Sequence, residues 1–134
     1  MKKLMIGLAG LLAVSMVAFA QTTKQDTMTK SSSYVDYVAK DFQANTTSKR
    51  VLFFAAAWCP TCRSADAEFK AKLSEIPKDV VIYKTDYDIE TALKQKYGIT
   101  HQHTFVYVNA KAEAIKKWSG GAMTEIIANT KSAK

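Results

Sequence analysis

The sequence contains only two cysteines, and they stand three positions apart as Cys59 and Cys62. A disulfide that closes so short a loop removes little conformational entropy from the unfolded chain, so a purely structural bond is poorly supported. The sequence also lacks an internal repeat, and its 134 residues suffice for one domain rather than two. Since 48% of the residues are hydrophobic, one core can be built.

Long blocks of charge are absent as well. The formal net charge is +7, but the lysines and arginines are spread thinly and form no run of five or six. Such a distribution is typical of a solvated basic surface, and we expect no nucleic-acid partner.

The one long apolar segment, residues 4–20, is 17 residues long, slightly short for a comfortable membrane span. It follows Lys2 and Lys3 and ends in Ala18-Phe19-Ala20, which together have the three parts of a secretory signal peptide. An uncleaved anchor is the alternative, but the Ala-x-Ala ending has no role in an anchor. No cysteine follows the run, which disfavours a lipid-modified N-terminus. We therefore predict a signal peptide over residues 1–20, cleavage near Ala20, no stable membrane anchor, and a periplasmic or secreted protein.

The remaining chain divides into a polar leader and one domain. Residues 21–33 offer almost nothing to bury and are predicted to be flexible, whereas residues 34–134 form the domain. Apolar spacing and turn residues predict helices at residues 34–42, 63–73, 89–97 and 123–131, and strands at 51–55, 80–83, 105–108 and 114–118. The first helix is expected to open with a capping box from Ser33 to Asp36.

Alternation of helices and strands predicts an α/β fold. The continuous apolar run 51–55 is typical of a strand buried on both faces of a mostly parallel sheet. The turn after residue 108 adds an antiparallel edge, so the sheet is expected to be mixed.

Cys59 follows a predicted buried strand and precedes a predicted helix. Unpaired N–H groups and the helix dipole at a helix N-terminus favour negative charge, which lowers the pKa of a cysteine there. Pro60 suits the first helical turn, and Thr61 and Cys62 can offer N–H groups to the Cys59 sulfur. Cys62 lies one turn further along and should be less exposed. These features predict Cys59 as the attacking thiol and Cys62 as the resolving thiol, in preference to a structural pair or a metal site.

The chain resembles the thioredoxin family in its strand and WCPTC segment, residues 54–62, and in residues 85–86, 96–99 and 104–108. The resemblance runs from about Ser33 to Lys131. It implies a three-layer α/β/α fold with a mixed sheet, a thiol–disulfide oxidoreductase without a cofactor, and an exposed Cys59 beside Trp58. Trp58, Pro60 and Thr61 are expected to contact protein substrates.

Two positions depart from the family pattern. The family carries a buried acid on the strand before the motif, where it helps to deprotonate the second cysteine, but Phe53 stands there. Asp66, one turn after Cys62, is a candidate replacement, although its spacing favours a surface residue. The family also places a cis-proline in the loop facing the two sulfurs, and His103 aligns with it. Backbone pairing with a substrate peptide would then pass to Gln102.

The only two histidines, His101 and His103, allow several interpretations. His103 can accept a proton from the thiol pair or stabilise the Cys59 thiolate, and we name it as a catalytic candidate. Two residues apart in an extended segment, both side chains would point the same way. A Cys₂His₂ site for zinc or copper, made by Cys59, Cys62, His101 and His103, is the alternative function. Solvent-facing loop residues are the third possibility.

The expected function is disulfide exchange with protein substrates. Partners are proteins that carry thiols or disulfides and an unidentified redox partner, and the chain is expected to be a monomer. Because Thr61 supplies no charge, reduction or isomerisation is favoured over strong oxidation. The alternative is a metal-binding protein of the same fold.

Overall fold

The computed structural model describes residues 32–131. The predicted signal peptide and nearly all of the predicted leader lie outside these residues. Within residues 32–131, no helix has both the length and the apolar character needed to cross a membrane.

Residues 32–131 form five strands, four α-helices and one short 3₁₀ helix. In chain order they are β1 (Tyr34–Asp36), α1 (Ala39–Ala44), β2 (Lys49–Ala55), α2 (Pro60–Ala71), η1 (Leu73–Glu75), β3 (Val80–Asp86), α3 (Thr91–Tyr97), β4 (Thr104–Val108), β5 (Ala114–Ser119) and α4 (Met123–Thr130).

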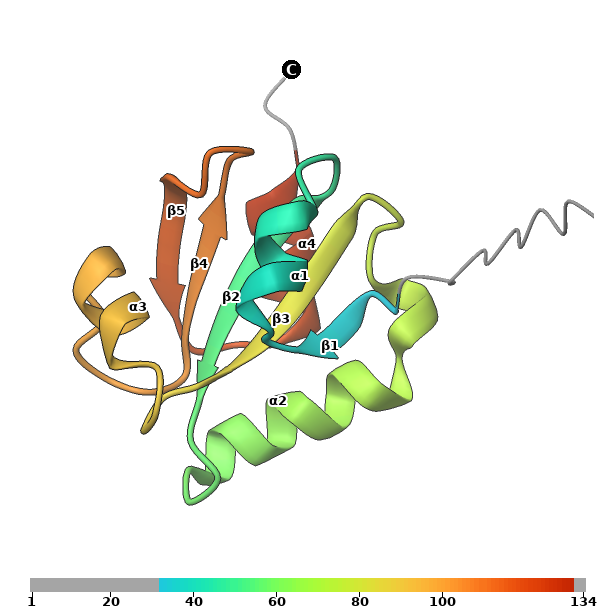
Figure 1. The fold of residues 1–134 in the computed structure, drawn as a ribbon. Coiled ribbons are helices and arrows are strands. Elements are labelled where there is room, and N and C mark those ends of the chain that lie inside the picture. Colours follow the sequence, from blue (N-terminus) through green and yellow to red (C-terminus); the bar gives the residue numbers. More distant parts are fainter. Residues whose placement is uncertain (1–31, 132–134) are drawn as a thin grey trace, which may run out of the picture.

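The strands form one mixed sheet in the order β1-β3-β2-β4-β5 (Figure 1). Strand β3 pairs in parallel with both β1 and β2, whereas β4 pairs antiparallel with β2 and with β5. The central strand β2 is buried along nearly its whole length, as its continuous apolar sequence predicts. This arrangement holds the end of β2, from which the cysteine segment leaves the sheet, beside the start of β4.

Two helices cover each face of the sheet, which gives the predicted three-layer α/β/α fold. Alternate residues of β2 point to opposite faces, so Val51 and Phe53 join one core while Leu52 and Phe54 join the other. The first core contains side chains of α2 and α4, and the second contains those of α1 and α3. The predicted fold class is therefore confirmed.

The N-terminal part of the domain differs from the sequence prediction. Residues 34–42 are not one helix: Tyr34–Asp36 is a strand in register with β3, and the helix begins only at Ala39. The predicted Ser33 capping box is wrong, since Val38 is the N-cap and offers no side-chain cap. Pairing with β3 and burial of Tyr34 against α2 outweigh the helical spacing of the apolar residues.

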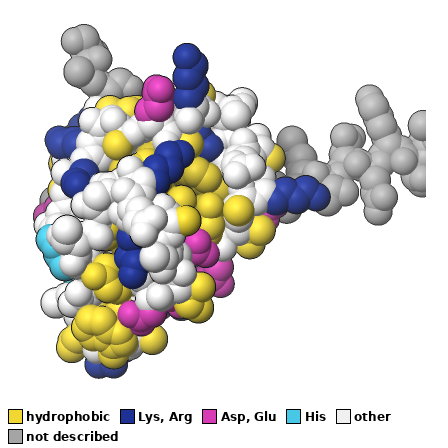
Figure 2. Space-filling view, turned by 60° about the vertical axis from the view of Figure 1, so that its left-hand side comes forward, with side chains coloured by type: hydrophobic (Ala, Val, Ile, Leu, Met, Phe, Trp, Pro, Cys, Tyr) yellow, Lys and Arg dark blue, Asp and Glu magenta, His cyan; other side chains and the backbone are white. Residues whose placement is uncertain are grey.

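Basic side chains are scattered over the surface. On the face drawn in Figure 2, lysine and arginine side chains lie at separate places among neutral ones. This distribution agrees with a solvated basic surface.

Candidate active site

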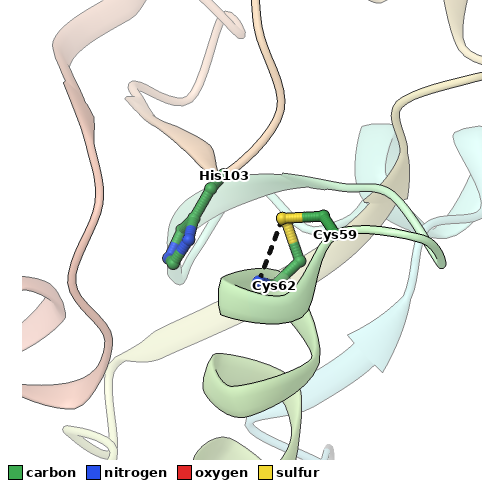
Figure 3. Close-up of side chains that lie close together, drawn as sticks. All are labelled: Cys59, Cys62 and His103. Carbon is green, nitrogen blue, oxygen red and sulfur yellow. Dashed lines mark hydrogen bonds between the residues drawn. The ribbon is translucent and has the colours of Figure 1, made fainter.

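The two cysteines lie where β2 passes into α2. Strand β2 ends at Ala55, Pro60 occupies the first turn of α2, and Cys59 is the N-cap residue. The backbone N–H of Cys62 donates a hydrogen bond to the Cys59 sulfur at 3.2 Å (Figure 3). The Thr61 hydroxyl lies 3.3 Å from that sulfur. The Cys59 sulfur thus takes the place of a capping oxygen at a helix N-terminus, where negative charge is favoured.

The surroundings separate the two thiols in acidity. Burial opposes ionisation of Cys59, but hydrogen bonds from Cys62 and Thr61 outweigh it and lower the pKa of the Cys59 thiol. Burial raises the pKa of Cys62, and the hydrogen bond to Cys59 raises it further. Cys59 is therefore the thiol that ionises first, as the attacking thiol must.

Exposure does not separate them. Cys59 and Cys62 are only 2% and 1% exposed, so the expectation of an exposed Cys59 beside Trp58 is wrong. Both sulfurs belong to the core between the sheet and α2, and the His103 side chain lies close to them. Hydrogen bonds, rather than access to solvent, therefore distinguish the two thiols.

His103 lies beside the two cysteines, as its position in the sequence predicts. It extends from the loop before β4 towards the start of α2 (Figure 3). One ligating atom each from Cys59, Cys62 and His103 lie within 4.8 Å of one another. The imidazole ring packs against the rings of Phe53 and Phe105, and its centroid lies 5.7 Å from the centroid of each.

The backbone of His103 has a left-handed conformation with φ of 55°. Its N–H donates to the carbonyl of Phe54 at 2.8 Å, and its carbonyl accepts from the N–H of Gly120 at 2.9 Å. Proline cannot adopt this φ, and it has no backbone N–H to donate. The loop is therefore built for a residue with an N–H, and it differs from a proline loop in more than its side chain.

The ring of His103 is fixed by a single hydrogen bond. Its Nε2 lies 2.7 Å from the carbonyl oxygen of Gly121, which can only accept. Nε2 therefore carries the hydrogen, and in the neutral ring the lone pair is on Nδ1. That nitrogen is free to accept a proton or to bind a metal.

His101 does not join this group. It is exposed, and its two ring nitrogens lie 3.1 Å from the Thr100 hydroxyl and 2.8 Å from the Ser119 hydroxyl. The prediction that both histidines point the same way is wrong, because the segment bends and the left-handed His103 breaks the two-residue alternation. Three of the four residues of the proposed Cys₂His₂ site come together, and His101 is not among them.

The predicted substrate-contacting residues surround the buried sulfurs. Trp58 is 57% exposed, and its indole N–H donates to Asp88 at 3.0 Å. Pro60 and Thr61 are exposed and Gln102 is partly exposed. They provide a rim that a peptide can contact, and their binding role stays a prediction.

Asp66 is more enclosed than the sequence suggested. Its side chain is 18% exposed and accepts hydrogen bonds from Tyr34 and Lys70, while Lys84 lies 2.9 Å away. Burial opposes ionisation, but these three partners lower the pKa of Asp66 to about 2. The prediction of a surface residue holds only in part, because Asp66 is half-buried. Asp66 lines the same pocket as Cys62, at one helical turn from it, but so acidic a carboxylate is a poor proton acceptor.

Phe53 fills the strand position where an acid was sought. It is fully buried and stacks on Phe105 with ring centroids 4.5 Å apart. The proton of Cys62 has no carboxylate to receive it at that place.

Similarity to known proteins extends over most of the chain. The family model described as Thioredoxin matches residues 25–132. Thioredoxin H3 of Arabidopsis thaliana is 32% identical over 100 residues, which are 74% of this chain and 83% of that protein. Thioredoxin H-type of Brassica oleracea is 36% identical over 76 residues, or 57% of this chain and 60% of that protein.

Solved structures show the same similarity. The reduced thioredoxin pre-protein of Schistosoma mansoni has a TM-score of 0.61 at 22% identity, covering 72% of this chain and 93% of that one. The thioredoxin of Fasciola hepatica has a TM-score of 0.58 at 29% identity, covering 67% and 85%. The matched residues include the cysteine pair and the loop that carries His103.

Proposed function

This chain belongs to the thioredoxin family and is a thiol–disulfide oxidoreductase, and on that basis we propose that it reduces or isomerises protein disulfides outside the cytoplasm, with Cys59 attacking and Cys62 resolving. The observation that carries the assignment of roles is the position of Cys59 as the N-cap of α2, with its sulfur accepting the N–H of Cys62. Hydrogen bonds favour the thiolate of Cys59 more strongly than they favour the thiolate of Cys62.

The reaction proceeds in two exchanges. The Cys59 thiolate attacks one sulfur of a substrate disulfide; a Cys59–substrate bond forms, the substrate S–S bond breaks, and the leaving thiolate takes a proton. Cys62 then loses its proton and attacks the Cys59 sulfur, which releases the second substrate thiol and leaves a Cys59–Cys62 disulfide. Two electrons have passed from the dithiol to the substrate. A partner dithiol of the same chemical class must return them.

His103 is the proposed proton acceptor for the second exchange. Phe53 replaces a carboxylate, and Asp66 is too acidic, whereas a ring nitrogen of His103 lies within 4.8 Å of both sulfurs and its Nδ1 has a free lone pair. On this proposal, His103→Asn slows disulfide exchange, while His101→Asn leaves its rate unchanged because that ring faces Ser119.

Features of the sequence support the proposed direction and location. Thr61 adds no positive charge between the cysteines, which favours reduction or isomerisation over strong oxidation. The signal-peptide pattern over residues 1–20 supports an extracytoplasmic location, where protein disulfides persist as substrates.

The test is a comparison of Cys59→Ser with Cys62→Ser in the reduction of insulin disulfides. Both variants lose turnover, but only Cys62→Ser should accumulate a mixed disulfide with substrate, visible as a covalent adduct that a small thiol releases. Equal trapping by the two variants would contradict the assignment of roles.

A further inference from the structure

The two thiols and the His103 ring form a compact set of metal-ligating atoms. One donor from each of Cys59, Cys62 and His103 lies within 4.8 Å of the other two. In residues 32–131 these three make the one such group of histidine, cysteine and acidic side chains. With proline at position 103 the group would contain only the two cysteine sulfurs, and the histidine adds the third donor.

The donor set indicates which class of ion can bind. Thiolate is a soft ligand and imidazole is intermediate, so the set selects copper(I) or zinc over magnesium and calcium. Structural zinc takes four protein ligands, and zinc with three protein ligands keeps a water in the fourth position. Here His101 is hydrogen-bonded to Thr100 and Ser119 and does not supply a fourth ligand. Both cysteines are nearly inaccessible to solvent, which disfavours a bound water as the fourth ligand. A buried set of three donors, two of them soft, suits a three-coordinate copper(I) ion.

The surroundings orient the imidazole for this task. Histidines that bind metals usually donate the second ring N–H to a carbonyl or carboxylate, which fixes the tautomer. His103 does so from Nε2 to the Gly121 carbonyl at 2.7 Å, leaving Nδ1 as the ligand atom. Phe53 and Phe105 pack against the ring. The left-handed backbone of His103 costs free energy, and strain of this kind is concentrated at functional sites.

We propose that the reduced chain binds one copper(I) ion through the sulfurs of Cys59 and Cys62 and Nδ1 of His103. Binding replaces the two thiol protons, which are released to solvent, and leaves the oxidation state of the metal and of both sulfurs unchanged. The Cys59–Cys62 disulfide form has no thiolate to offer and does not bind. Metal binding and disulfide exchange therefore exclude each other. This site goes beyond the proposed function and needs the dithiol but not the exchange activity.

The experiment is an anaerobic titration of the reduced full chain with copper(I) against the chromophoric chelator bicinchoninate, with a parallel arm in which Zn²⁺ is the only metal. Wild type should take up one copper(I) per chain in competition with the chelator. His103→Asn should weaken that binding by at least about 10-fold. Asparagine tolerates the left-handed conformation, so this variant removes the imidazole at little cost to the backbone. His101→Asn is the matched control and should bind as wild type does.

Three outcomes would overturn the proposal: equal copper(I) affinity for His103→Asn and wild type, no copper(I) uptake, or tighter binding of zinc than of copper(I). X-ray absorption of the loaded wild type should show two sulfur neighbours and one nitrogen, and a site with sulfur alone would also contradict it. Insulin reduction by the metal-free protein is measured separately. A chain that reduces insulin but binds no copper(I) refutes only the metal site, and the reverse result refutes only the proposed function.

Discussion

The N–H of Cys62 donates to the sulfur of Cys59 at 3.2 Å, so the resolving cysteine stabilises the thiolate of the attacking one. Burial raises the pKa of Cys62, and a separate hydrogen bond between the two thiol side chains and the negative charge of Cys59 raise it further. These contacts at the start of α2 support the proposed order of the two thiols in the exchange reaction. They also explain why two equally buried thiols are expected to behave differently.

Proline at position 103 should destabilise the domain rather than restore a family-like loop. The native residue has φ of 55° and donates to Phe54, and proline can do neither. His103→Pro should lower the free energy of unfolding by more than about 1 kcal/mol.

His103→Gly is the control, because glycine adopts the left-handed conformation freely and keeps the N–H that donates to Phe54, so it should lose less stability than His103→Pro. Both are measured by urea unfolding of the reduced protein. A His103→Pro variant as stable as wild type would show that the loop is not held in this conformation.

Asp66 should stabilise the fold in a pH-dependent way. Its folded-state pKa of about 2 lies below the ordinary value of 3.8, so its contribution is complete above about pH 5 and is lost as the pH falls through 2. After allowance for solvent screening, Asp66→Asn should cost about 1 kcal/mol at pH 7 and almost nothing at pH 2.

Glu68→Gln removes another carboxylate of α2 that also pairs with a lysine four residues on, but in a more exposed position. Its effect at pH 7 should be smaller, at most about 0.5 kcal/mol. If the two variants lose the same stability at every pH, the enclosed position of Asp66 does not add to the stabilisation by its ion pairs.

Cleavage of the signal segment should leave Gln21 as the first residue. The Ala18-Phe19-Ala20 ending predicts this site. N-terminal sequencing of the protein from the extracytoplasmic fraction of cells that express the full chain provides the measurement. Recovery of uncleaved protein in the membrane fraction would indicate an anchor instead.

Much of the fold can be predicted because local and tertiary preferences agree. The apolar run of β2 predicts a strand buried on both faces, and Gly98 ends α3 in the left-handed conformation, as expected of a C-terminal glycine. The place of the cysteines at the N-terminus of α2 follows from the same reasoning. Strand β1 was missed because its apolar spacing also fits a helix, and only pairing with β3 decides between the two.

The errors in the site have a common cause. The sequence does not reveal that His103 has a positive φ, and this single dihedral angle separates the two histidines. Burial of Cys59 likewise depends on long-range packing, and two of the three partners of Asp66, Tyr34 and Lys84, are distant in the chain. Residue types and spacing identified these side chains as candidates, but long-range packing determines their environments.

The central claim is that Cys59 ionises far more readily than Cys62, and the pH dependence of alkylation tests it most directly. Reduced protein is treated with iodoacetamide over a range of pH, and mass spectrometry of peptides resolves the rate at each cysteine. Cys59 should react with an apparent pKa below that of a free cysteine, about 8.5, and Cys62 with one well above it. Identical profiles for the two cysteines, or faster reaction of Cys62 at neutral pH, would contradict the account.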